Sequence, residues 1–187
     1  MDSDILLPGG GFAELKSYQK SLIIFEGTAC FVRRFLKNGD RTIDQMIQAA
    51  RSGKQNIIEG SAAAVISKET EIKLTGVAMA SLEELLEDYK DYLRIHNLTI
   101  WDKNSIPALA VRKLAYRKDE CYDTNRPYLE SRSDGTCANI MICQINQCTY
   151  LLRRQLKKLA EEFPLHGGIR ERMTKARLNY RDGKKQP

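Results

Sequence analysis

Four segments of the chain carry apolar residues at steps of three and four, and this pattern constrains the fold most. The four seams consist of Leu15, Tyr18, Leu22, Phe25, Ala29, Val32 and Leu36; of Ile43, Met46, Ala50, Gly53 and Ile57; of Ala78, Leu82, Leu85, Tyr89 and Tyr92; and of Met141, Ile145, Cys148, Leu152, Leu156, Leu159 and Phe163. Such spacing places each seam on one face of an α-helix. No window alternates like a strand between turn residues. We predict an all-α, up-down four-helix bundle.

Turn and capping residues indicate where these helices begin and end. Asn38-Gly39-Asp40 separates the first two helices, with Gly39 suited to a helix C-terminus and Asp40 to an N-cap. Ser67 opens the third helix. The fourth is predicted to begin after Gly135 and to stop at Pro164.

Two glycines bear on the second helix, predicted from about Arg41 to Glu59. Gly53 lies on its seam, where it either weakens the helix or admits a close neighbour. Gly60 is expected to end the helix in a left-handed conformation.

The remaining segments divide the chain further. Residues 1–11 are predicted to be a flexible lead, residues 12–163 the bundle, and residues 164–187 a basic C-terminal suffix. Residues 97–135 form a long insertion between the third and fourth helices, with one short helix (Ser105 to about Arg117), a polar remainder and the sole tryptophan, Trp101. The suffix contains a short helix with the apolar stripe Ile169, Met173, Ala176 and Tyr180. That stripe requires burial on the bundle, on a neighbouring copy or on nucleic acid.

Composition excludes several classes of protein. Hydrophobic residues make up 42% and charged residues 29% of the chain, as in soluble globular proteins. The acidic start, Met1 to Asp4, and the lack of a long apolar run predict neither export nor membrane insertion, so a cytoplasmic location is expected. The five cysteines are expected to be reduced, small hydrophobic residues. No metal or other cofactor is expected.

Positive charge is concentrated at the C-terminal end. Residues 1–152 carry 19 basic and 20 acidic residues, whereas residues 153–187 carry 11 and 4. This asymmetry is typical of an arm that binds an anionic partner, although a solubilising tail would look similar.

Basic side chains spaced along the helices are the candidate nucleic-acid contacts, because lysine and arginine neutralise phosphates without reading sequence. The candidates are Arg33, Arg34, Lys37, Arg41, Arg51, Lys54, Arg153, Arg154, Lys157, Lys158, Arg170, Arg172, Lys175, Arg177 and Arg181. A solvated helix face is the alternative interpretation. Aromatic residues that could stack on bases are scarce near these cations, with Tyr180 as the exception. Recognition of the nucleic-acid backbone or shape is therefore expected.

Catalytic chemistry is not indicated. Glu83, Glu84, Glu87 and Asp88 lie off the seam of the third helix and are interpreted as a solvated face. His96 and His166 lie at helix ends, where exposed or capping roles are expected. The chain is therefore predicted not to be an enzyme.

Two stretches resemble a known family. Ala49-Ala50-Arg51-Ser52 with Asn56-Ile57-Ile58-Glu59-Gly60, and Ala80-Ser81-Leu82-Glu83-Glu84-Leu85, are similar to the bacterial four-helix-bundle family of the ribosomal-RNA intervening-sequence protein and the diversity-generating retroelement accessory protein. The second half of the chain resembles the variant with a suffix domain. The residues that carry this resemblance are Ala138-Asn139 through Tyr150-Leu151-Leu152, then Phe163 and Gly167-Gly168-Ile169-Arg170-Glu171-Arg172-Met173. Asn56, Glu59, Gly60, Ser81 and Glu84 are the signature residues, for which structural roles are expected.

The resemblance implies a homopentamer with a basic surface that engages RNA or DNA, and in retroelement members a reverse transcriptase partner. The expected function is that of a non-enzymatic, oligomeric nucleic-acid-binding protein. The alternative is a homo-oligomeric scaffold, in which the insertion and the suffix pack against neighbouring subunits.

Overall fold

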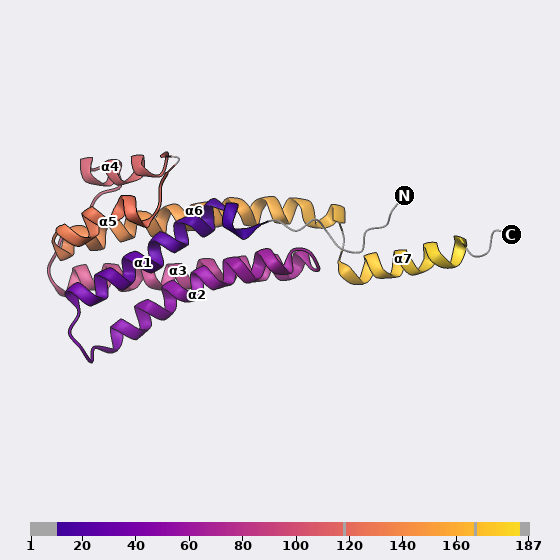
Figure 1. The fold of residues 1–187 in the computed structure, drawn as a ribbon, viewed down its shortest axis with the longest axis horizontal. Coiled ribbons are helices and arrows are strands. Elements are labelled where there is room, and N and C mark those ends of the chain that lie inside the picture. Colours follow the sequence, from indigo (N-terminus) through magenta and orange to yellow (C-terminus); the bar gives the residue numbers. More distant parts are fainter. Residues whose placement is uncertain (1–10, 118, 167, 184–187) are drawn as a thin grey trace.

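The computed structural model describes residues 11–117, 119–166 and 168–183, and all regular elements among them are helical (Figure 1). The elements are η1 (Phe12–Glu14), α1 (Lys16–Phe35), α2 (Arg41–Ala63), α3 (Lys68–Ile95), α4 (Ile106–Leu114), α5 (Tyr122–Ser131), α6 (Asp134–His166) and α7 (Ile169–Gly183). The predicted all-α class is confirmed. The predicted N-terminal lead, except Gly11, lies outside the described residues. Across the described ranges, no helix has both the length and the apolar character needed to cross a membrane.

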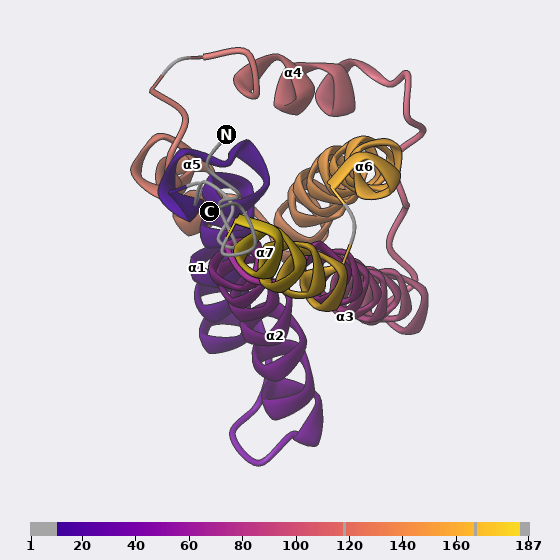
Figure 2. The same ribbon diagram turned by 90° about the vertical axis from the view of Figure 1, so that its right-hand side faces the viewer.

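The four long helices α1, α2, α3 and α6 pack side by side around one apolar core (Figure 2). α1 and α3 each contact both α2 and α6, and successive long helices run in opposite directions (Figure 1). The predicted seam of α3 is buried throughout, and that of α6 is buried except for half-buried Leu156 and Phe163. These apolar faces hold the helices together.

The predicted N-caps of α2 and α3 are confirmed. Asp40 Oδ1 accepts a hydrogen bond of 2.9 Å from the backbone N–H of Thr42, and Ser67 Oγ accepts one of 3.2 Å from that of Thr70. Each bond satisfies a donor that the first turn of a helix leaves without an intrahelical partner. Gly39 has a positive φ of 91°, although α1 already ends at Phe35, so the glycine serves the turn rather than the helix end itself.

The two glycines of α2 both face α3, and Gly53 allows α3 to approach closely. A Cβ on Gly53 would lie 2.8 Å from Leu82 Cδ2, so the close-approach interpretation of Gly53 is correct. The prediction that Gly60 ends α2 is wrong, because the helix continues to Ala63 and Gly60 has no positive φ. Gly60 is buried, and a Cβ there would lie 3.4 Å from Leu74 Cβ. This is an ordinary van der Waals distance, so Gly60 packs against α3 without the close approach seen at Gly53.

The predicted ends of α6 are also wrong. The helix begins at Asp134, before Gly135, and it continues through Pro164 to His166. Proline cannot donate the hydrogen bond that would reach the carbonyl of residue 160. Pro164 lies in the last turn, so this loss affects only the end of the helix.

α1 buries a different face from the one that its heptad seam predicts. Of the seam residues only Val32 is buried, whereas the buried set is Ser17, Lys20, Ser21, Ile23, Ile24, Gly27, Thr28, Cys30, Phe31 and Val32. α1 packs against α2, α5 and α6, so more of its circumference is covered than one stripe provides. The polar positions on this face are satisfied: Ser17 Oγ donates to Gln155 Oε1 at 3.1 Å, and Tyr89 Oη donates to Thr28 Oγ1 at 3.1 Å.

The insertion contains more structure than predicted. The expected short helix is present as α4, which packs on α6, but the expected polar remainder includes a second helix, α5, which packs on α1 (Figure 2). Leu129 of α5 is only 2% exposed and belongs to the central core. The sequence did not predict α5, because Pro127 and the mostly polar composition of this segment are typical of loops.

A buried lysine connects the insertion to α1 and α6. Lys20 is 4% exposed, and its Nζ donates to Glu120 Oε1 at 2.5 Å, Gln144 Oε1 at 2.8 Å and Gln147 Oε1 at 2.9 Å. Gln144 Nε2 in turn donates to Asn125 Oδ1 at 2.9 Å. Burial lowers the pKa of Lys20, although the hydrogen bond and charge of Glu120 act in the opposite direction. No sequence pattern predicted this cluster.

Candidate nucleic-acid interface

Four cations on the second half of α6, Arg153, Arg154, Lys157 and Lys158, form the α6 ladder. All four are exposed, and their steps of one, three and one residues place them along one side of the helix. Arg153 Nη2 lies 2.8 Å from Glu83 Oε1 of α3. The two lysines face Glu161 and Glu162 at 4.0 and 3.6 Å, so acidic neighbours already offset part of the ladder's charge.

Arg154 makes a different contact. Its guanidinium carbon lies 6.0 Å from the ring centroid of Tyr150, an exposed residue one turn earlier on the same helix. This distance is at the limit of a cation–π contact, so the interaction holds Arg154 only weakly.

α7 extends beyond the end of the four long helices that carries the turn between α2 and α3 (Figure 1). None of the other described helices packs against it, and none of its described residues is buried. Lys175, Arg177 and Arg181 are exposed. Arg172 is half-buried, and its Nη2 donates to the Ile66 carbonyl in that turn at 2.7 Å. The side chain of Arg170 lies outside the described part of the helix.

The first basic group lies at the other end of the molecule. Arg33, Lys37 and Arg41 are exposed around the turn from α1 to α2, and we call them the turn cluster. Figure 1 shows this turn at the opposite end from the junction of α6 with α7. The structure therefore separates the predicted contacts into two groups, and a single continuous interface is not formed by one copy of the chain.

Arg34 has a structural role instead of joining the turn cluster. Its Nη1 donates to the Leu129 carbonyl, its Nη2 donates to the Arg132 carbonyl at 3.0 Å, and its guanidinium lies 4.3 Å from the Phe35 ring centroid. The carbonyls at the C-terminus of a helix have no intrahelical donors. Arg34 supplies donors to the end of α5, so its guanidinium group is already engaged within the molecule.

The two remaining candidates lie on α2. Arg51 is exposed, whereas Lys54 is half-buried, with its Nζ 4.3 Å from the ring centroid of Phe25. Burial raises the pKa of Glu26, the charge of Asp123 raises it further, and the charge of Lys54 acts in the opposite direction. Lys54 thus contributes to packing between α1 and α2 and is less accessible to a phosphate than Arg51.

The family-signature residues divide into two kinds. Asn56 Nδ2 donates to the Ser52 carbonyl at 2.8 Å and to Ser52 Oγ at 3.1 Å, and Ser52 Oγ lies 3.0 Å from Ser81 Oγ. This chain of hydrogen bonds joins α2 to α3. Glu59 and Glu84 are exposed, and Gly60 is a packing glycine.

The acidic group on α3 is only partly the solvated face that was predicted. Glu83 pairs with Arg153, and the pairing of Glu87 with Lys90 at 2.6 Å lowers the pKa of Glu87. Asp88 is half-buried, and its Oδ2 is buried without a hydrogen-bond partner among the described residues. Burial raises the pKa of Asp88, and the charges of Glu84 and Asp91 raise it further. The prediction is wrong for Asp88 because α3 turns this side chain toward the packed surface.

Cysteine and histidine side chains form no metal-binding group within the described ranges. Cys30, Cys137 and Cys148 are buried as free thiols in the core, as expected of small hydrophobic residues, and burial raises the pKa of Cys148 to about 12. His96 stacks on Tyr92 with ring centroids 4.1 Å apart, and its Nδ1 lies 2.8 Å from the Tyr92 carbonyl oxygen at the end of α3. The side chain of His166 is not among those described.

Comparison of the chain with family models, with curated proteins and with solved structures gave no match.

Proposed function

We propose that this chain is a non-enzymatic accessory protein that binds the phosphate backbone of RNA or DNA through α7 and the α6 ladder. The observation that carries the proposal is the placement of α7. Lys175, Arg177 and Arg181 are exposed on a helix that no other described helix covers. Long cationic side chains on a projecting helix can reach several phosphates of a strand at once, and this contact needs no sequence-specific groups.

The ion pairs of the α6 ladder are compatible with this role. Exposed pairs of this kind contribute about 0–1 kcal/mol, because water screens them and two flexible side chains must be ordered. A phosphate can therefore replace Glu83 as the partner of Arg153, or Glu161 as the partner of Lys157. α7 follows α6 directly, so the two basic segments supply one continuous stretch of chain.

We also propose a finer classification. The four long helices would form an up-down four-helix bundle, with residues 97–135 as its insertion and residues 164–187 as its suffix. The chain would then be a relative of the bacterial family named above, closest to the variant with a suffix domain. That kinship implies a cytoplasmic homopentamer and makes a reverse transcriptase a candidate protein partner. In a ring of copies, the separate basic groups of each chain would repeat around each rim.

The test compares two charge reversals of equal size. Binding of the full chain to labelled RNA and DNA is measured by fluorescence anisotropy between about 50 and 200 mM salt, where a protein with several phosphate contacts loses orders of magnitude in affinity. The variant K175E/R177E/R181E removes the exposed cations of α7. The control R33E/K37E/R41E makes the same change in charge at the turn cluster, on the opposite end of the molecule.

The proposal predicts that the α7 variant loses binding while the turn-cluster variant keeps most of it. Each lost phosphate contact should also reduce the slope of log affinity against log salt by about one. Helical circular dichroism and mass in solution should be unchanged, since all six side chains are exposed. Equal losses in the two variants would show that net charge alone matters, and full binding by the α7 variant would contradict the proposal.

A homo-oligomeric scaffold is the second candidate, and the outer face of α4 favours it. Ile106 at the start of α4 is 86% exposed, Tyr116 just after its end is 87% exposed, and Leu109 between them is 40% exposed. Large exposed apolar side chains in one region are typical of protein contacts. If I106E/L109E lowers the mass in solution and the wild-type chain binds no nucleic acid, the scaffold is the better description.

A further inference from the structure

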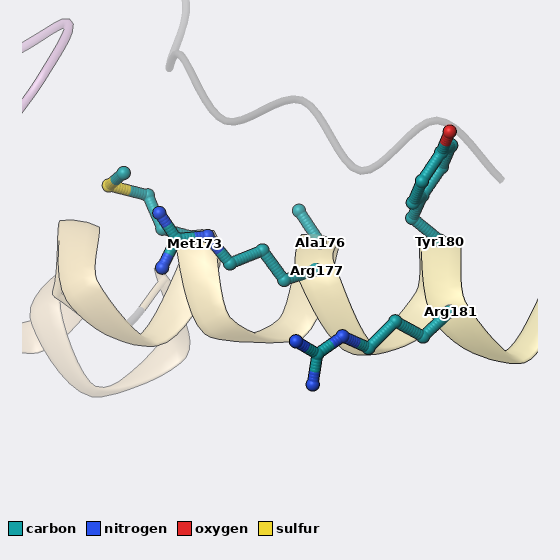
Figure 3. A pocket seen from close by; sticks show the side chains of 5 residues that line it. All are labelled: Met173, Ala176, Arg177, Tyr180 and Arg181. Carbon is teal, nitrogen blue, oxygen red and sulfur yellow. The ribbon is translucent and has the colours of Figure 1, made fainter.

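One face of α7 combines an aromatic ring, a small apolar surface and two guanidinium groups around a shallow hollow. The hollow is lined by Met173, Ala176, Arg177, Tyr180 and Arg181. Their steps of three, one, three and one place them on a single side of the helix. Figure 3 shows Met173, Ala176 and Tyr180 projecting from the same side, while the arginine side chains run along the helix toward its N-terminus.

The side chains differ in what they offer a ligand. Tyr180 is 65% exposed and Met173 39% exposed, so ring and thioether surfaces are both accessible to solvent. An aromatic ring stacks on any nucleobase, because every base has a flat π surface. The guanidinium groups of Arg177 and Arg181 can donate paired hydrogen bonds to phosphate oxygens. A free phosphate would need only the arginines, and an apolar peptide only the remaining surface. A nucleotide uses both.

A base can stack on this surface only if it is unpaired. Bases in a duplex are stacked on one another and present only their edges, whereas an unpaired base presents its flat face. We infer that the hollow on α7 takes an unpaired nucleotide, with the base stacked on Tyr180 above Met173 and Ala176 and the phosphate held by Arg177 and Arg181. The inference rests on the proposed function and adds to it that the bound nucleic acid contains a single-stranded segment.

The α6 ladder provides a contrast within the same surface. Its exposed tyrosine, Tyr150, has its ring centroid 6.0 Å from the guanidinium carbon of Arg154. Lys157 and Lys158 are followed by acidic partners rather than by a second aromatic ring. The ladder is thus suited to phosphates of either a duplex or a single strand, while the hollow on α7 is suited to the single strand alone.

The experiment measures binding of the full chain to an unstructured single strand and to a duplex of the same length, at one salt concentration. Each is prepared as RNA and as DNA, which separates recognition of the base and phosphate from recognition of the 2′-hydroxyl group. The wild-type chain should prefer the single strand. Y180A should weaken single-strand binding about tenfold and leave duplex binding unchanged, because one stacking contact is lost. Y180F should bind as the wild type does.

Y116A is the matched control, since Tyr116 is also an exposed tyrosine with basic neighbours in the sequence, but it follows α4, which lies at the opposite end of the molecule from α7 (Figure 1). It should change neither affinity. If Y180A weakens both ligands equally or neither, the stacking inference is wrong, while salt-dependent binding by the wild type would leave the proposed function standing. If the wild type binds neither ligand, the proposed function and the inference both fail. Tyr180 is exposed, so its replacement should leave the helical spectrum unchanged.

Discussion

The insertion, apart from its last two residues in α6, and the suffix helix α7 both lie outside the four long helices, yet they differ in how they pack. The insertion contributes Ala108, Val111 and Leu129 to buried positions and attaches its polar groups to Lys20 and Arg34. α7 has a clearer apolar stripe in its sequence but no buried residue in its described part. Amphipathic spacing shows that a helix has a face to cover; whether this chain covers it depends on the surface available nearby.

The comparison also separates stability from binding. The insertion should matter for the free energy of unfolding, and α7 for affinity. Substitutions in and around the two regions test this division.

Lys20→Ala should be the most damaging change, since it leaves Glu120 and two glutamine carbonyls around Lys20 without their donor. Removing one partner from a buried ion pair costs about 3–5 kcal/mol. Urea unfolding followed by circular dichroism measures this loss. The control is Lys16→Ala, an exposed lysine on the same helix, which should change stability by less than about 0.5 kcal/mol. Similar values for the two variants would show that the cluster does not hold the insertion.

Leu129→Ala should destabilise the protein by about 2–5 kcal/mol, the usual range for removing a buried leucine side chain. The neighbouring Tyr128→Ala should have a much smaller effect, because Tyr128 is exposed. Thermal and urea unfolding of the pair show whether α5 belongs to the cooperative core. A separate, earlier transition for α5, with the main transition unchanged in Leu129→Ala, would contradict this assignment.

Arg34→Gln should destabilise the protein by about 1–3 kcal/mol, because the carbonyls of Leu129 and Arg132 lose charged donors. The adjacent Arg33→Gln is the control and should be nearly neutral, as Arg33 is exposed. Neither variant should weaken binding in the way that changes in α7 do. If Arg34→Gln strongly loses nucleic-acid affinity while its stability is retained, Arg34 contacts the nucleic acid and its role is not mainly structural.

The effect of Lys20 should also depend on pH. Burial lowers its pKa below the ordinary value of 10.5, so as pH rises toward 10.5 the unfolded chain holds a proton that the folded chain has already released. Stability from this residue therefore increases with pH in that window. The difference in unfolding free energy between the wild type and Lys20→Ala should grow as the pH rises toward 10.5. If this difference in unfolding free energy shrinks as the pH rises, the pKa of Lys20 is not lowered in the folded protein.

Met173→Ser should have the smallest effect on stability, less than about 0.5 kcal/mol, because no described helix packs against α7. Thermal unfolding at two protein concentrations measures it. A fall of several degrees that depends on concentration would place the stripe against a second copy of the chain and would favour the scaffold.

Much of the fold could be predicted from local pattern. The seams of α3 and α6 and the caps Asp40 and Ser67 follow from side-chain spacing and from polar side chains that bond to nearby backbone groups. α5 could not be predicted, because Pro127 and a polar composition are typical of loops. The buried face of α1 was missed because a polar residue can be buried only where partners exist, and the partners of Lys20 lie 100 or more positions away.

The candidate site shows the same division. Sequence alone identified the cationic side chains of α6 and α7, and it determined the helical class, since hydrophobic periodicity and capping act over a few residues. Only the tertiary structure decided that the turn cluster lies at the far end, that Arg34 donates to the end of α5 and that no described helix packs against α7. These outcomes depend on which surfaces meet in three dimensions, and spacing along one helix carries no information about its neighbours.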